Sequence, residues 1–379
     1  MPYLCPMAGI YIHIPFCKQA CHYCDFHFST SLKYKDELLQ ALVKEINLQK
    51  TYLAGETIET IYFGGGTPSI LDTDELNKLI NTITELHAVA SNAEITIEAN
   101  PDDLGKAKLK ALRQTDINRF SIGIQSFFDD DLMWMNRVHR AKEAEASVKR
   151  AQDTGFENIT VDLIYGYPLL TDVKWKYNLD KVFELDIPHV SSYSMTVEPQ
   201  TALASFIKKK KQPAMDEQQS AEQFTTLMEA MQNHGFEHYE ISNFCKPGHY
   251  SRHNSNYWKG IKYLGIGPSA HSFNGETRQW NIANNAKYIE SLEKTKIPAE
   301  TEVLTEADRL NEYIMTSLRT MWGLELSRLN TIAKGASDEL IKATESFFEK
   351  GWIQQNNNVI TLTPDGKLYA DHIASELFF

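Results

Sequence analysis

The stretch Gly9–Cys24, GIYIHIPFCKQACHYC, joins an apolar segment directly to three closely spaced cysteines. The segment before the cysteines is rich in isoleucine and aromatic side chains and predicts a β-strand. Cys17, Cys21 and Cys24 then follow in a C-x3-C-x2-C pattern. A structural zinc site normally uses four ligands, whereas three thiolates suit a [4Fe-4S] cluster in which one iron keeps an open coordination position. The motif therefore predicts chemistry at the end of a strand, because an open iron can bind a small molecule.

The composition predicts a cytoplasmic protein with one large and one smaller domain. The chain has 379 residues, of which 42% are apolar, and a formal net charge of -12. A net acidic chain disfavours nucleic acid as the main partner, and the run Lys208–Lys211 is expected to be a solvated loop or helix end. The odd cysteine count, with Cys5 and Cys245 outside the motif, fits a reducing compartment better than a disulfide framework. We expect neither a signal peptide nor a membrane span.

Strand-like and helix-like segments alternate through the first two thirds of the chain. Six βα units in a row predict a parallel sheet with right-handed crossovers. Partial (β/α)6 and complete (β/α)8 TIM-type barrels both fit this pattern, and a doubly wound sheet is the other option. The expected strands are Gly9–Phe16, Thr57–Phe63, Ala93–Glu98, Arg119–Gln125, Asn158–Ile164 and His189–Val197.

The pattern changes after the core that we expect over residues 1–245. The segment Cys245–Gly275 is rich in Gly, His, Asn, Ser and aromatic residues, and we expect ordered loops there, within a connecting segment over residues 246–300. From about Thr305, helix-like segments precede two short strands and a last helix that starts at Pro364. This order predicts a small α+β winged-helix-like domain over residues 301–379. Its Lys and Arg are sparse, so DNA binding is not expected.

Polar or glycine-rich residues follow the predicted strands, where sites form in parallel α/β folds. Gly64–Thr67 follows the second strand, Glu98 ends the third, Gln125 ends the fourth and Asp162 lies in the fifth. Glycines admit a ligand close to the backbone, and carboxylates accept hydrogen bonds from ribose hydroxyls or an amine. Arg137 can clamp a carboxylate. Taken singly, each residue has an ordinary alternative, namely a tight turn, a capping or backbone-binding carboxylate, or a solvated basic turn.

These motifs resemble the radical SAM superfamily. The cysteine pattern, with Tyr23 before its last cysteine, is similar to that family's cluster motif, and Gly64–Thr67 is similar to its glycine motif. The resemblance implies a partial (β/α)6 TIM-type barrel, a [4Fe-4S] cluster held by the three cysteines, and S-adenosyl-L-methionine that is cleaved to a 5′-deoxyadenosyl radical. It also implies an electron donor such as a flavodoxin or ferredoxin. The S-adenosylmethionine contacts that it implies are Tyr11, Tyr23, Gly65, Gly66, Thr67, Glu98, Gln125, Arg137 and Asp162.

Within the superfamily, the chain resembles the coproporphyrinogen oxidase-like branch over nearly its whole length, through segments such as Tyr11–Cys17 and Ser121–Ser126. The branch includes oxygen-independent coproporphyrinogen III dehydrogenases (HemN), which convert propionates to vinyls in porphyrin biosynthesis, and heme chaperones (HemW). HemN-type sequences carry a fourth cysteine two positions after the third, where this chain has Phe26. The resemblance therefore implies a heme chaperone with little turnover, with heme and an apo-hemoprotein as partners. The dehydrogenase is the alternative.

The segment His253–Trp258, HNSNYW, resembles the H-N-x-x-Y-W motif of HemW-type proteins. This resemblance implies that His253 meets heme. The chemistry of the residue alone favours a polar loop histidine bonded to the backbone, and Tyr257 and Trp258 are equally good core residues. Both roles of His253 are open at this point.

Overall fold

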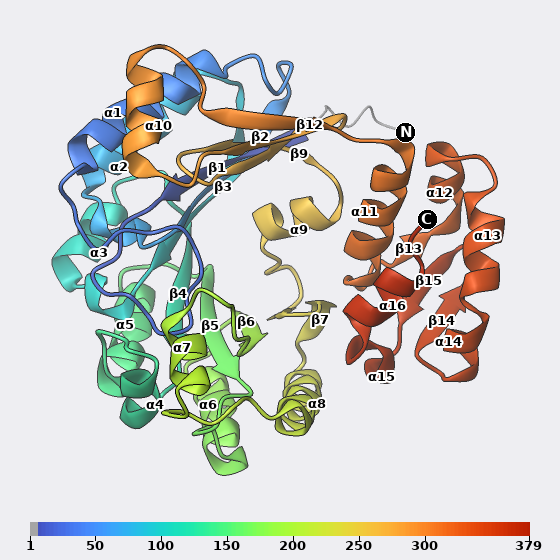
Figure 1. Cartoon of the computed structure of the whole chain (residues 1–379). Coiled ribbons are helices and arrows are strands. Elements are labelled where there is room, and N and C mark those ends of the chain that lie inside the picture. The colour runs from blue at the N-terminus through green and yellow to red at the C-terminus, as the bar shows by residue number, and fades with distance from the viewer. Residues whose placement is uncertain (1–6) are drawn as a thin grey trace.

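The protein is built on a curved parallel sheet with helices outside it and a smaller module beside it (Figure 1). The computed structural model describes residues 7–379, so Cys5 lies outside the described residues. All six expected strands are present, in sequence order and parallel, which confirms the prediction of a partial α/β barrel. They are β1 (Met7–Ile14), β2 (Thr57–Gly65), β3 (Val89–Ala99), β4 (Arg119–Gln125), β5 (Ile159–Tyr165) and β6 (His189–Ser194).

The strands alternate between two faces, and β1 shows how. Ile10, Ile12 and Ile14 are fully buried among the apolar residues of the helices outside the sheet. Tyr11 and His13, between them, point to the inner face, since side chains of a strand alternate. The covering helices are α1 (Lys35–Leu48), α2 (Thr73–Leu86), α3 (Lys106–Leu112), α4 (Asp129–Trp134), α5 (Ala141–Asp153) and α6 (Asp172–Glu184).

Further strands extend the sheet at both edges. The strand β9 pairs in parallel with β1, and β10, β11 and β12 continue antiparallel, while β8 and β7 follow β6. The two edge strands of the described sheet, β12 and β7, do not pair with each other, so the barrel is open. The added strands are β7 (Glu237–Glu240), β8 (Asn243–Cys245), β9 (Lys262–Ile266), β10 (His271–Phe273), β11 (Thr277–Asn281) and β12 (Ala299–Val303).

The expectation of ordered loops over Cys245–Gly275 is therefore wrong for much of that segment. It holds the helix α9 (Arg252–Trp258) and the strands β9 and β10, and β11, the helix α10 (Asn285–Glu293) and β12 follow it. The strand β9 depends on pairing with β1, far away in the sequence, and local composition does not encode such a partner. The helices α7 (Ala202–Lys208) and α8 (Glu217–Asn233) lie between β6 and β7.

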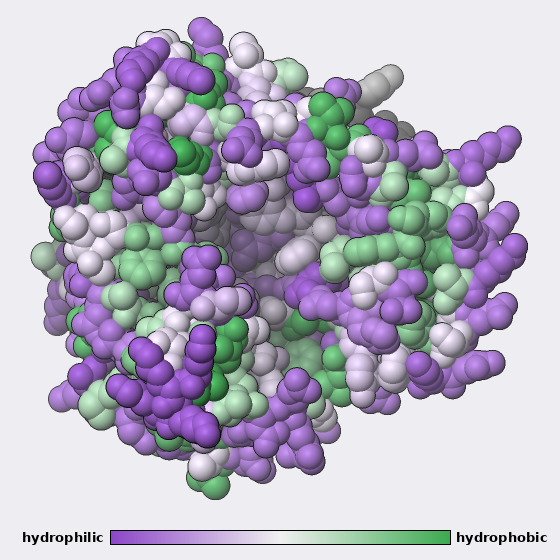
Figure 2. Space-filling model, viewed as in Figure 1, coloured by the Kyte–Doolittle hydropathy of each residue, from purple (hydrophilic) through white to green (hydrophobic). Residues whose placement is uncertain are grey.

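The C-terminal residues form a module with its own hydrophobic cluster, from Leu310 to Leu377. Its helices surround a three-stranded sheet of order β13-β15-β14, and the helical segment from Ala336 to Glu349 is divided in two at Thr344. Figure 2 shows the surface hollowed between this module and the barrel. The elements are α11 (Glu306–Leu318), β13 (Leu324–Glu325), α12 (Leu326–Ile332), α13 (Ala336–Ala343), α14 (Glu345–Glu349), β14 (Ile353–Asn356), β15 (Val359–Leu362), α15 (Pro364–Lys367) and α16 (Ala370–Glu376).

Within residues 7–379, no helix is both long enough and apolar enough to cross a membrane.

Candidate functional site

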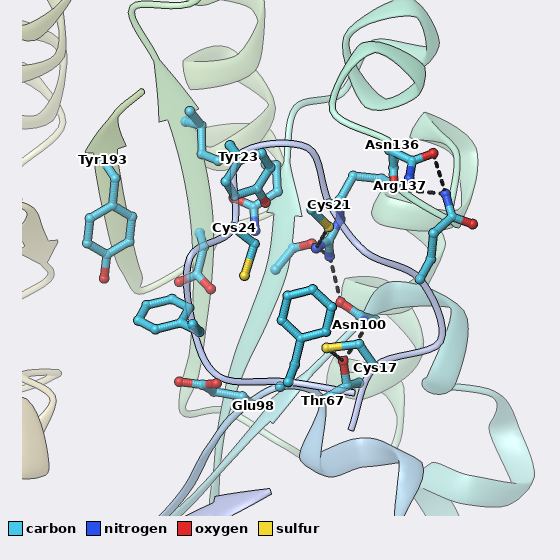
Figure 3. A pocket seen from close by; sticks show the side chains of 18 of the residues that line it. Cys17, Cys21, Tyr23, Cys24, Thr67, Glu98, Asn100, Asn136, Arg137 and Tyr193 are labelled. Atoms are coloured by element: carbon cyan, nitrogen blue, oxygen red, sulfur yellow. Dashed lines mark hydrogen bonds between the residues drawn. The ribbon is translucent and has the colours of Figure 1, made fainter. Parts of the chain in front are cut away.

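A cavity of about 490 Å³ opens at the carboxyl ends of the parallel strands (Figure 3). The structure brings together there all of the predicted cluster and S-adenosylmethionine residues except Tyr11. Those that line the cavity are Cys17, Cys21, Tyr23, Cys24, Gly65, Gly66, Thr67, Glu98, Gln125, Arg137 and Asp162.

The three cysteines lie on the loop between β1 and α1. A backbone hydrogen bond holds the loop, since Cys17 N donates to Ser29 O at 3.0 Å. A side-chain contact adds to it, because Thr67 Oγ1 lies 3.6 Å from Cys17 Sγ. Burial raises the pKa of the Cys24 thiol to about 12 and also raises the pKa of Cys17. Without a bound metal these thiols are protonated at neutral pH, so they are poor candidates for free nucleophiles.

The placement of the thiols suits a cluster better than a single ion. Among the described residues, no three Cys, His, Asp or Glu side chains converge closely enough to hold one metal ion. Cys17, Cys21 and Cys24 instead lie spaced along one loop that lines the cavity (Figure 3). A cluster needs this arrangement, because each thiolate binds a different iron. The residues therefore fit the predicted [4Fe-4S] cluster.

Arg137 connects the cysteine loop to the strand ends. Its Nη1 lies 3.4 Å from Cys21 Sγ, and its Nη2 donates to Asn100 Oδ1 at 2.6 Å and to Gly123 O at 2.8 Å. Its Nε is buried and has no hydrogen-bond partner among residues 7–379, which is unusual for a guanidinium donor. Asn100 was missed by the sequence analysis. It also donates to Thr67 Oγ1 at 3.1 Å, and the signal for it was its position just beyond the end of β3.

Glu98 is held by two donors at the end of β3. Tyr62 Oη donates to Oε1 at 2.8 Å, and the backbone N of Gly65 donates to Oε2 at 3.1 Å. Burial raises the pKa of the Glu98 carboxyl to about 7. Gly65 has a φ of 105° and would place a Cβ 2.5 Å from the His13 ring, so only glycine fits there. Tyr62 is a second residue that sequence reasoning missed.

Asp162, on β5, and Gln125, at the end of β4, also line the cavity. Ser121 Oγ donates to Asp162 Oδ1 at 3.1 Å, and burial raises the pKa of Asp162 to about 6. Gln125 has a φ of 67°, a backbone conformation that is costly for a residue other than glycine. Such strain is concentrated at functional sites. The buried carboxylates, the arginine and the glycine turn together can bind a ligand that carries amine, carboxylate and hydroxyl groups.

Two aromatic side chains that line the cavity are exposed, and we call them its mouth. Phe26, in place of the fourth cysteine of HemN-type sequences, is 68% exposed, and Tyr193 is 45% exposed. Phe28 and the buried Met195 also line the cavity. Exposed aromatic residues beside a polar cavity indicate a binding surface for a ligand or a partner.

Two predicted residues do not line the cavity. Tyr11 lies behind Gly64, where its Oη is 3.2 Å from His13 Nδ1. His253, on α9, is 2% exposed. Its Nδ1 is 2.8 Å from Thr60 Oγ1 and its Nε2 is 2.8 Å from Tyr257 Oη, so both ring nitrogens are hydrogen-bonded.

Comparison with known proteins agrees with this geometry. The family model described as the radical SAM superfamily matches residues 11–182. The heme chaperone HemW of Bacillus subtilis is 36% identical over 371 residues, which cover 97% of this chain and 98% of that protein. The chain belongs to the HemW family. Membership of the radical SAM superfamily implies a [4Fe-4S] cluster and S-adenosylmethionine.

Other members of the HemW family and one solved structure extend the comparison. HemW of Escherichia coli is 35% identical over 273 residues, which cover 70% of each chain. The solved structure of coproporphyrinogen III oxidase (HemN) from Escherichia coli superposes with a TM-score of 0.86 over 98% of this chain and 90% of its own, at 24% identity. That likeness establishes a shared radical SAM fold and carries no statement about activity.

Proposed function

We propose that this protein is a heme chaperone, which binds heme and passes it to an apo-hemoprotein. The sequence support is the match to HemW proteins along nearly their whole length. The structural observation that carries the proposal is the open cavity whose mouth presents Phe26 and Tyr193 to solvent. Heme is a planar and mostly apolar ring, and exposed aromatic side chains stabilise such a ring by stacking and by burial of apolar surface.

We further propose the cofactor contacts residue by residue. Cys17, Cys21 and Cys24 hold the cluster, and Arg137, beside Cys21, orients the loop that carries them. Tyr23, Gly65, Gly66, Thr67, Glu98, Gln125 and Asp162 form the walls that bind S-adenosylmethionine. When bound, the cluster and S-adenosylmethionine supply one-electron reductive chemistry. The residues of this chain position the ligand and limit access of water to it.

A heme titration tests the proposal. The cluster would be reconstituted without oxygen, and heme would be added to the loaded protein while its absorption spectrum is followed. We expect saturation at one heme per chain and transfer of that heme to an added apo-hemoprotein. A spectrum that does not saturate, or heme that is never released to an acceptor, would contradict the proposal.

The alternative is an oxygen-independent coproporphyrinogen III dehydrogenase of porphyrin biosynthesis. The resemblance of its sequence motifs to the coproporphyrinogen oxidase-like branch is the observation that favours it. Anaerobic incubation of the loaded protein with coproporphyrinogen III and S-adenosylmethionine decides between the two. Formation of protoporphyrinogen would establish the alternative, and its absence with a fully loaded cluster would exclude it.

We propose that an acidic electron donor, such as a flavodoxin or ferredoxin, docks at Lys208–Lys211. These lysines are exposed and form no ion pair within the described chain. Their segment is attached beside the cysteine loop, because Leu203 N donates to His22 O at 2.8 Å and the Phe206 ring packs edge-on against His22. A basic patch next to the cluster loop of an otherwise acidic protein would attract an acidic partner.

We also propose that the protein is cytosolic and that its chain is divided into three parts. Cysteine usage supports a cytosolic protein, which cell fractionation tests. Residues 1–245 would form the core, 246–300 the connecting segment and 301–379 the C-terminal domain. The separate hydrophobic cluster of the last part supports that boundary, and limited proteolysis tests it.

A further inference from the structure

The inner face of β1, β2 and β3 is arranged in layers between α9 and the cavity. The lowest layer is formed by Gly9, Thr60 and Glu94, which are paired across the three strands. Two residues further along the strands, Tyr11 is paired with Tyr62 in the middle layer. Another step along the strands brings His13 beside Gly64, near the Glu98 carboxylate. Alternate residues of a strand share a face, so these three layers stand on one another. The lowest layer meets α9, and the highest layer lies beside Glu98, which lines the cavity.

His253 is fixed within the lowest layer. Its backbone N donates to Glu94 Oε1 at 3.0 Å, and its ring bonds to Thr60 as described above. Gly9 leaves the space that the ring occupies, since a Cβ there would lie 3.3 Å from it. Burial lowers the pKa of the imidazole to about 3, so the ring is neutral. His253 therefore has one defined position.

The middle layer connects His253 with the residues that line the cavity. The His253 ring is stacked on Tyr62 at 5.0 Å between centroids and 26° between planes, and Tyr62 is stacked on Tyr11 at 6.0 Å and 25°. The Tyr62 hydroxyl then donates to Glu98. The path from His253 to the wall of the cavity contains only one intervening side chain.

We propose that His253 is a positioning residue for the S-adenosylmethionine site: its ring supports Tyr62, which orients the Glu98 carboxylate toward the ligand. The inference rests on the proposed contact between Glu98 and S-adenosylmethionine. It gives the HNSNYW segment a role in cofactor binding. His253 would not be a heme ligand in this arrangement, because both of its ring nitrogens are already bonded and it does not line the cavity.

The test measures binding of S-adenosylmethionine by calorimetry to the cluster-loaded protein and to its variants. Tyr62→Phe keeps the stacked ring and removes only the bond to Glu98. We expect Tyr62→Phe to raise Kd by about tenfold, the loss of one hydrogen bond to a charged group. His253→Phe should raise Kd severalfold, and the Tyr62→Phe/His253→Phe double variant should show less than the product of the two effects, since the residues act through one path.

His189→Phe is the matched control. His189 is a second fully buried histidine, on β6, and its Nε2 lies 2.7 Å from Tyr239 Oη. Neither residue lines the cavity, so this variant should lose comparable thermal stability and keep the wild-type affinity for S-adenosylmethionine. Wild-type affinity in a folded His253→Phe variant would overturn the proposal, as would an equal loss in His189→Phe.

A heme titration of the same preparations separates this inference from the proposed function. If His253 positions the cofactor site, His253→Phe binds heme as the wild type does. If His253→Phe loses heme and keeps S-adenosylmethionine affinity, His253 is a heme ligand and the positioning role is excluded. Failure of the wild-type protein to bind heme would contradict the chaperone function and leave the S-adenosylmethionine result intact.

Discussion

Polar and charged side chains lie at both ends of the inner face of this barrel, but they line an open cavity at one end and are buried and hydrogen-bonded at the other. At the carboxyl ends, the thiols, carboxylates and Arg137 line an open cavity, and one guanidinium donor has no partner among the described residues. At the α9 end, His253 and Glu94 are closed off, and both ring nitrogens of His253 are bonded. A polar residue in a motif is therefore available for a ligand only where the fold leaves its donors or acceptors free.

The largest expected effect concerns the three cysteines. Cys17→Ser, Cys21→Ser or Cys24→Ser should reduce iron after reconstitution from about four per chain to nearly none, because each thiolate holds a different iron. Iron analysis and visible absorption measure this loss. Cys245→Ser is the control, since Cys245 is buried in β8 away from the cavity. Equal iron loss in Cys245→Ser, or full iron content in the three motif variants, would contradict the assignment of Cys17, Cys21 and Cys24 as the cluster ligands.

The next effect concerns the charge of Glu98. Its pKa of about 7 in the folded protein lies above the usual carboxyl value, so the proton binds as the pH falls through that range. A carboxylate accepts hydrogen bonds from a ligand better than a carboxylic acid does. We expect S-adenosylmethionine affinity to fall roughly tenfold between about pH 8 and about pH 6, with Asp162 adding to the fall at the acidic end. Binding measured across that range provides the test.

Glu98→Gln supplies the control for the pH experiment. This variant should bind weakly at about pH 8 and lose most of the pH dependence, because the titrating group is gone. Stability without ligand should change in the opposite direction. The folded state holds the Glu98 proton more tightly than the unfolded state, so Glu98 contributes added stability as the pH falls below about 7. An unchanged pH profile in Glu98→Gln would show that another group controls binding.

The smallest expected effect concerns the lysines beside the cysteine loop. Lys209→Gln/Lys210→Gln should slow cluster reduction by an acidic flavodoxin severalfold at low salt, and the difference should shrink as salt screens the charges. Stopped-flow absorption follows the reduction. The control is Lys334→Gln/Lys342→Gln, which removes two exposed charges from the C-terminal module. Equal slowing by both pairs would indicate net charge alone, and reduction by dithionite should be the same in all variants.

Much of the cavity could be predicted from the sequence, because its residues follow strands. Once the strands were placed, parallel topology brought Gly65, Glu98, Gln125 and Asp162 to one edge. The strands after residue 246 could not be predicted in the same way, since β9 exists through its pairing with β1. Asn100 and Tyr62 were missed because their roles are to hold Arg137 and Glu98, and such support is visible only in three dimensions. The hydrogen bonds of the His253 ring with Thr60 and Tyr257 could not be predicted for the same reason.

The heme affinities of two variants, measured side by side, test most directly whether heme binds at the cavity end of the barrel and not at the α9 end. Phe26→Ala/Tyr193→Ala removes the exposed aromatic surface at the mouth, and His253→Phe alters the closed end. Val173→Ala, on the outer helix α6, is the control for loss of an exposed apolar side chain. We predict that the mouth variant raises the Kd for heme by about tenfold or more, while His253→Phe and Val173→Ala keep the wild-type value. Loss of heme binding in His253→Phe with wild-type affinity in the mouth variant would contradict the account.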